Sequence, residues 1–130
     1  MPVFNIEHIG LTVTDPVAMA EWYRDVLGFT IAFSGADDEK AVAFIIDAGG
    51  KIMLELGKLP GIAPLADRID HHLQAHIALL SDDPLKDAAY LESKGATFIE
   101  KCPVTRPGEL LVVLRDPWGI TIQLVRRSSA

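Results

Sequence analysis

Residues 74–80, Gln-Ala-His-Ile-Ala-Leu-Leu, decide the fold, because an earlier stretch of the chain repeats their pattern. Apolar Ala75, Ile77 and Leu79 alternate with His76 and Ala78, and this alternation predicts a β-strand. Residues 7–13, Glu-His-Ile-Gly-Leu-Thr-Val, form a second such stretch with a histidine followed by an isoleucine. The two stretches are the first sign that the chain contains two copies of one unit.

The features that follow each histidine keep the same order and spacing. An Asp-Pro pair comes seven residues after His8 and again seven residues after His76. Each pair opens an apolar, helix-like run that ends in a glycine, because Asp caps a helix, Pro suits its first position and Gly its end. A strand with one polar residue follows in each copy, and the interval is 47 residues both from His8 to Glu55 and from His76 to Gln123. This spacing indicates an internal duplication of a β-α-β-β-β unit.

The duplication predicts an α+β fold, a single domain of two tandem βαβββ modules that together form a cupped mixed sheet. The first module is expected over residues 1–57, a linker rich in Gly and Pro over 58–72, and the second module over 73–130. The expected strands are 4–13, 29–33, 41–47 and 51–56, then 74–80, 97–101, 109–115 and 120–125. The expected helices are 16–27 and 84–94, and residues 34–38 are expected to form a polar loop.

Composition narrows the class of function. The chain has 12 basic and 18 acidic residues, a net charge of −6, and no basic cluster, which argues against binding to nucleic acid or to anionic membranes. No apolar run reaches the about 20 residues that span a bilayer. The N-terminus shows no signal-peptide pattern, and Cys102 is the only cysteine, so a cytoplasmic protein is expected.

Four polar side chains are expected on one face of the sheet. His8, Glu55, His76 and Gln123 each alternate with large aliphatic residues, and the aliphatic residues should take the face that packs on the helices. If a pseudo-twofold axis relates the modules, the four converge, and two imidazoles, a carboxylate and a carboxamide oxygen suit a borderline divalent metal. Taken singly, each histidine would be an ordinary core or surface residue, Glu55 an ion-pair partner and Gln123 an exposed strand residue. Their matching places in two copies favour the metal site.

These features together resemble the vicinal oxygen chelate superfamily, the glyoxalase/bleomycin resistance protein/dioxygenase group. The resemblance covers the chain nearly end to end, from the opening His-Ile-Gly-Leu-Thr-Val to Asp-Pro-Trp-Gly at 116–119, and includes Leu-Gly-Phe at 27–29. It implies a metal held by the first and last strands of each module, here by His8, Glu55, His76 and Gln123. The metal would be Zn, Ni, Co, Mn or Fe, and the substrate a small molecule with two adjacent oxygens.

The ligand set most resembles glyoxalase I, a lyase that isomerises the hemithioacetal of methylglyoxal and a thiol through an enediolate. The departure is Gln123, where such proteins usually have a glutamate that also moves the proton. A carboxamide does not take up a proton near neutral pH, so either Glu55 is the base or the reaction is a different one. An epimerase and a ring-cleaving dioxygenase of the same superfamily remain open.

The alternative from another class is a small-molecule-binding protein like the bleomycin-resistance members. Those often lack metal ligands, so a full set of four argues against this function. The resemblance also implies a homodimer. Three other features are expected to be ordinary: His71 and His72 a solvated pair in the linker, Arg106 and Arg115 surface cations unless they meet an anionic substrate, and Cys102 without a catalytic setting.

Overall fold

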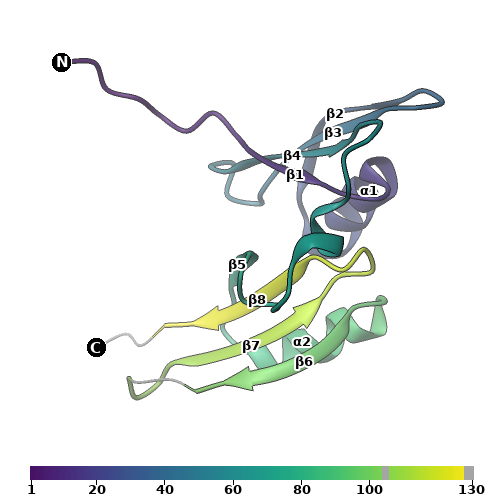
Figure 1. Cartoon of the computed structure of the whole chain (residues 1–130). Helices are drawn as coiled ribbons and strands as arrows, with labels where there is room; N and C mark the ends of the chain where they lie inside the picture. The colour runs from purple at the N-terminus through teal and green to yellow at the C-terminus, as the bar shows by residue number, and fades with distance from the viewer. Residues whose placement is uncertain (104–105, 128–130) are drawn as a thin grey trace. The chain divides into compact units, whose positions relative to one another are not determined.

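The computed structural model describes residues 1–103 and 106–127, which form two compact units that meet in sequence between residues 68 and 69 (Figure 1). The first unit contains β1 (Ile9–Thr12), α1 (Pro16–Leu27), β2 (Thr30–Ala36), β3 (Ala41–Ile46), β4 (Met53–Lys58) and a 3₁₀ turn (Leu65–Arg68). The second unit contains β5 (His76–Leu80), α2 (Pro84–Ser93), β6 (Thr97–Cys102), β7 (Leu110–Arg115) and β8 (Thr121–Arg126). Among the described residues, no helix is long and apolar enough to cross a membrane.

Each unit is a four-stranded sheet with one helix, and the two sheets have the same topology. The strand order is β1-β4-β3-β2 in the first and β5-β8-β7-β6 in the second. In each sheet the first and last strands of the unit are parallel neighbours, and the other neighbouring pairs are antiparallel. The predicted α+β fold of two tandem βαβββ modules is confirmed.

The helices begin in nearly identical ways. Asp15 accepts a hydrogen bond from the Ala18 N–H at 3.1 Å, and Asp83 accepts one from the Lys86 N–H at 3.3 Å. Both caps have extended backbones, φ −146° and ψ 84° at Asp15 against φ −143° and ψ 81° at Asp83, and a proline follows each. A carboxylate that satisfies a free N–H and a proline whose φ is already helical start a helix at a fixed residue.

The repeat extends to irregular features that the spacing alone does not predict. The pairing of β2 with β3 shifts register between Ile31 and Phe33, and the pairing of β6 with β7 shifts between Phe98 and Glu100. Each shift is a β-bulge, an extra residue that bends its strand. The turn before the last strand of each unit is held by an aspartate, whose Oδ1 accepts two backbone hydrogen bonds of 2.9 Å.

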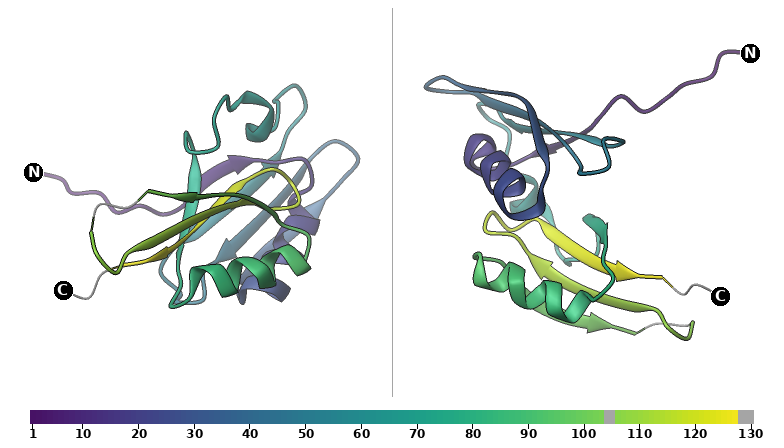
Figure 2. Two further views of the ribbon diagram at one scale, coloured as in Figure 1. Left: turned by 90° about the horizontal axis from the view of Figure 1, so that it is seen from below. Right: turned by 180° about the vertical axis from the view of Figure 1, so that it is seen from behind.

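One face of each sheet packs against the helix of its unit, and the other, which we call the helix-free face, does not. Figure 2 shows α2 lying along one side of the strands of its unit. The buried residues Leu54, Leu56, Ile122 and Leu124 lie on the helix side, while Glu55 and Gln123 between them are only partly buried. Because side chains alternate along a strand, Glu55 and Gln123 belong to the helix-free faces.

Two boundaries differ from the prediction. The first strand begins at Ile9 and not near residue 4, because its neighbour β4 begins at Met53 and offers no partner to the segment before residue 8. That segment leaves its sheet and extends away from it (Figure 1). The polar loop predicted from residue 34 is also wrong at its start, since Ser34 and Gly35 pair with β3 and belong to β2.

Candidate metal-binding residues

In the first unit, two of the four candidate ligands lie together on the helix-free face. Glu55 pairs with Gly10 on β1 and with Phe44 on β3, and His8 directly precedes β1. The Nε2 atom of His8 is 3.6 Å from Oε2 of Glu55, and the His8 ring meets the Phe44 ring edge-on at 5.7 Å between centroids. Gly10 has no side chain to cover the Glu55 carboxylate, so this group keeps an open approach from β1.

The other ring nitrogen of His8 is occupied. Nδ1 is hydrogen-bonded to the Glu7 carboxylate at 2.5 Å, and an ionised carboxylate only accepts, so Nδ1 carries the proton. In the neutral ring the lone pair is therefore on Nε2, the nitrogen that faces Glu55. The hydrogen bond that Nδ1 donates to Glu7 is the main reason that the pKa of His8 lies above its ordinary value. Burial, the second-largest effect, opposes the rise, and the charges of Glu7 and Glu55 add to it.

In the second unit, the other two candidates lie on neighbouring strands. Gln123 on β8 pairs with Ala78 on β5, and His76 pairs with Thr121 two residues earlier, so both side chains belong to the helix-free face. The pairing of Ala78 with Gln123 matches the pairing of Gly10 with Glu55 in the first unit. Nδ1 of His76 donates to the backbone carbonyl of Leu73 at 3.2 Å, which again leaves the lone pair on Nε2.

Each unit carries two of the four candidates on its helix-free face, His8 and Glu55 in the first and His76 and Gln123 in the second. Within the described residues, no group of three His, Cys, Asp or Glu side chains is placed to hold a metal ion. His8 and Glu55 in the first unit nevertheless lie at a distance at which both could bind one metal ion. Two ligand atoms that are each about 2.1 Å from one ion lie about 3–3.5 Å apart, close to the 3.6 Å between His8 Nε2 and Glu55 Oε2.

The two histidines also share the feature that prepares an imidazole for a metal. Metal-bound histidines almost always donate their second ring N–H to a carboxylate, a backbone carbonyl or a water, which fixes the tautomer and orientation of the ring. Glu7 is this acceptor for His8 and the Leu73 carbonyl is this acceptor for His76. The donor set and its tautomers therefore fit a divalent metal.

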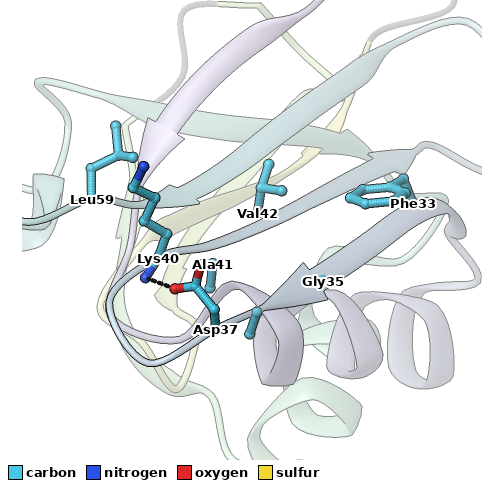
Figure 3. A pocket seen from close by; sticks show the side chains of 8 residues that line it. Phe33, Gly35, Asp37, Lys40, Ala41, Val42 and Leu59 are labelled. Carbon is cyan, nitrogen blue, oxygen red and sulfur yellow. Dashed lines mark hydrogen bonds between the residues drawn. The ribbon is translucent and has the colours of Figure 1, made fainter.

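The first unit has a cavity of about 390 Å³ beside the helix-free face of its sheet (Figure 3). Phe33, Val42 and Leu59 give it an apolar lining, and Figure 3 shows the Lys40 side chain reaching along it toward Leu59. Phe33 pairs with Phe44, the neighbour of Glu55, so the cavity adjoins the row of residues that carries the candidate ligand. No pattern in the sequence indicates this cavity, because it depends on how β2 and β3 are paired.

The second unit contains a cluster of polar side chains, around His72 and Glu100, that the sequence does not predict. The His72 side chain is only 12% exposed, and its Nε2 is 2.9 Å from Oε2 of Glu100 on β6. The expectation that His71 and His72 are both solvated is therefore wrong for His72, while His71 is exposed and stacks on it at 4.1 Å. Buried Cys102 donates its S–H to Oε1 of Glu100 at 3.6 Å, and the pKa of this thiol is raised by burial first and by Glu100 second.

Comparison with known proteins agrees with the fold. The model of the Glyoxalase/Bleomycin resistance protein/Dioxygenase superfamily matches residues 5–124. No curated protein sequence matches the chain. Among solved structures, a glyoxalase family protein from Bacillus cereus has a TM-score of 0.76 and 14% identity, over 96% of this chain and 95% of that one.

Two further structures come from proteins with stated ligands. The antibiotic-binding protein TnmS3 of a Streptomyces species has a TM-score of 0.70 and 20% identity, over 98% of this chain and 99% of its own. A mutant of the fosfomycin resistance protein FosX from Listeria monocytogenes, in complex with Mn(II) and a dihydroxypropylphosphonic acid, has a TM-score of 0.73 and 13% identity, over 98% of this chain and 95% of its own. At these identities the likeness shows the fold.

The contact between Glu7 and His8 gives a first testable prediction. In Glu7→Gln the pKa of His8 should fall toward the ordinary value of about 6.5, because the largest cause of its rise is removed. In Glu55→Gln it should fall by less, since Glu55 is the smallest of the causes. Titration of the His8 ring protons by NMR measures both changes. A larger fall in Glu55→Gln than in Glu7→Gln would contradict the assignment.

Proposed function

Because the chain belongs to the glyoxalase/bleomycin resistance protein/dioxygenase superfamily, we propose that it binds a divalent metal and acts on a small substrate with two adjacent oxygens. The observation that carries the proposal is that His8 and His76 share one tautomer. Nδ1 of each ring donates a hydrogen bond to an oxygen, which leaves the lone pair of each Nε2 available to a metal. A structural role would not require the same tautomer in both copies.

The proposed ligands are His8 and Glu55 from the first unit and His76 and Gln123 from the second. When bound, the metal would act as a Lewis acid on two adjacent substrate oxygens. Zn, Ni, Co, Mn and Fe all suit imidazole and oxygen donors, and the Mn(II) in the FosX complex supports a metal in this fold. The apolar cavity beside Phe33 would hold a hydrophobic part of the substrate, and Lys40 would meet an anionic group.

This ligand set favours a glyoxalase I-like enzyme, a lyase or isomerase. Such a reaction moves a proton between adjacent carbons, and among the four ligands only Glu55 is a carboxylate, so it is the candidate base. Gln123 would bind through its oxygen but would not accept the proton. A carboxylate that is bound to a cation is a weaker base, so Glu55 would serve best if it left the metal during turnover.

The second candidate is a protein that binds a small molecule without transforming it. The apolar cavity favours it, since apolar lining with a few polar groups is typical of ligand sites. TnmS3, which has the same fold, is an antibiotic-binding protein. The prepared histidines favour the enzyme, because a binding protein does not require a metal site. Cys102 is buried and forms no disulfide, which is consistent with a cytoplasmic protein under either proposed function.

Metal binding is the direct test of the proposed function. Protein purified without chelator or affinity tag should contain about one divalent ion per ligand set, and calorimetry should show affinity that falls more than about tenfold in His8→Ala and in His76→Ala. Because protons compete for Nε2, affinity should also decline as the pH falls through the raised pKa of His8. Glu92→Gln, which removes an exposed charge on α2 outside the ligand set, is the control. A protein that takes up no Zn, Ni, Co, Mn or Fe would reject the proposal.

Turnover separates the enzyme from the binding protein. The metal-loaded protein should convert the hemithioacetal of methylglyoxal and glutathione, and chelation should abolish the reaction because the Lewis acid is lost. Glu55→Gln should lower both the rate and the metal affinity. A protein that binds metal but shows no turnover of this compound would exclude the glyoxalase I-like reaction and favour another substrate or a binding role.

We also infer that the chain forms a homodimer. Val3, Phe4 and Ile6, in the segment that precedes β1, have exposed fractions of 85%, 90% and 80%. Apolar side chains exposed in series on an extended segment are typical of an interaction surface. Light scattering at micromolar concentration should give about twice the chain mass of 14.1 kDa. Replacing Phe4 and Ile6 by Ser should shift the protein toward monomer, and a monomeric wild type would contradict the inference.

A further inference from the structure

His72 and Glu100 form an imidazole–carboxylate pair on the second sheet that the proposed ligand set does not use. The atoms Nε2 of His72 and Oε2 of Glu100 are 2.9 Å apart, yet Nε2 is buried and the contact is not aligned as a hydrogen bond. In proteins without substrate, catalytic hydrogen bonds are often poorly aligned and tighten when substrate binds.

The pair lies on the same face as the candidate ligand Gln123. Glu100 pairs with Val113 across β6 and β7, and Val113 pairs with Gln123 across β7 and β8. Paired residues of neighbouring strands point to the same side of a sheet, so Glu100 belongs to the helix-free face with Gln123. The two residues are two strand spacings apart, or about 10 Å, and the His72 side chain comes to Glu100 from the segment just before β5.

The segment that carries His72 is held by its own hydrogen bonds. Oε1 of Gln74 accepts from the backbone N–H groups of Asp70 and His71 at 2.7 Å and 2.8 Å. Nδ1 of His71 accepts from the Leu73 N–H at 3.1 Å, and its ring stacks on that of His72 with a 27° angle between planes. These contacts hold the His72 ring in place before substrate arrives.

The same segment orients the candidate ligand His76. The Leu73 carbonyl that accepts the hydrogen bond from His76 Nδ1 belongs to the residue directly after His72. The position of the imidazole–carboxylate pair and the position of a proposed metal ligand therefore depend on one short turn. On the other side, Glu100 is oriented by the Cys102 thiol, which donates to its second oxygen.

We propose that His72, and not the metal-bound carboxylate of Glu55, is the general base of this site and that Glu100 is its positioning residue. His72 would supply the proton transfer that the carboxamide of Gln123 does not perform. The inference rests on the proposed function. Glu100 would hold the tautomer with the proton on Nε2, so that Nδ1 has the lone pair, as a carboxylate does for a catalytic histidine in hydrolases. The substrate class is a carbonyl compound with a hydroxyl on the adjacent carbon.

The step balances without another reactant. Nδ1 takes a proton from the carbon that bears the hydroxyl, the electron pair of the broken C–H bond forms a carbon–carbon double bond, and the carbonyl electron pair moves to its oxygen. The imidazolium, stabilised by Glu100, then returns the proton to the neighbouring carbon. The hydroxyl proton moves to the oxygen of the former carbonyl, and a carbonyl forms on the carbon that bore the hydroxyl. No electron is gained or lost overall, and the ring ends in its starting form.

The test follows exchange of hydrogen for deuterium in hydroxyacetone, a small probe with two adjacent oxygens, by NMR in D₂O with the metal-loaded protein. Removal of a general base typically costs about 100-fold or more, so His72→Gln should slow exchange by about that factor and leave metal affinity within about twofold. Glu55→Gln should instead weaken metal binding. Glu92→Gln, an exposed change of the same kind on α2, is the matched control and should alter neither.

Glu100→Gln, which keeps the size of the side chain, tests the positioning role. The ¹⁵N resonances of His72 should show a proton on Nε2 in the wild type and a loss of this preference in Glu100→Gln, with slower exchange as well. This readout requires no metal and no substrate. An unchanged tautomer would overturn the role of Glu100.

The outcomes separate this inference from the proposed function. Unchanged exchange in His72→Gln, or a wild type that binds metal and shows no exchange above free metal, would overturn the base and leave the metal site intact. A wild type that binds no metal would overturn the proposed function and this role with it, and calorimetry identifies that case. Circular dichroism of each variant shows whether it is folded.

Discussion

The parallel pairing of the first and last strands in each unit is the constraint on which the rest of the structure depends. It places Gly10 beside Glu55 in one sheet and Ala78 beside Gln123 in the other, in the same register. A shift of one residue would turn every side chain of a strand to the opposite face. The polar residues would then be buried against the helices and the aliphatic residues exposed, so the apolar core and the candidate site are fixed by the same register.

This constraint explains why much of the fold was predictable. Apolar alternation identifies the strands, and the two Asp-Pro pairs identify where the helices begin, because these signals are local. The face that carries Glu55 and Gln123 also follows from alternation. Alternation does not tell which residues of that face are neighbours on adjacent strands. The register of the strands decides this, and it is set by turns and by bulges at Ile31 and Phe98 that have no clear signature in the sequence.

The features that could not be predicted depend on contacts between distant residues. His72 and Glu100 meet because a turn before β5 brings the imidazole over a sheet whose far edge is β6, and neither residue stands in a motif. Glu7 is exposed and stands in no motif, and only the structure shows that it accepts the hydrogen bond from Nδ1 of His8. β1 starts later than the sequence predicts, because the apolar residues before His8 resemble strand residues but have no neighbouring strand to pair with.

In the proposed metal site, one ion would bind one imidazole from each copy of the duplicated unit, His8 and His76. X-ray absorption spectroscopy of the Ni- or Zn-loaded protein counts the imidazoles bound to the ion. The account predicts two in the wild type and one in either His8→Asn or His76→Asn, with metal–nitrogen distances of about 2.0–2.1 Å. A metal with no imidazole ligands, or a count that stays at two in both variants, would contradict it.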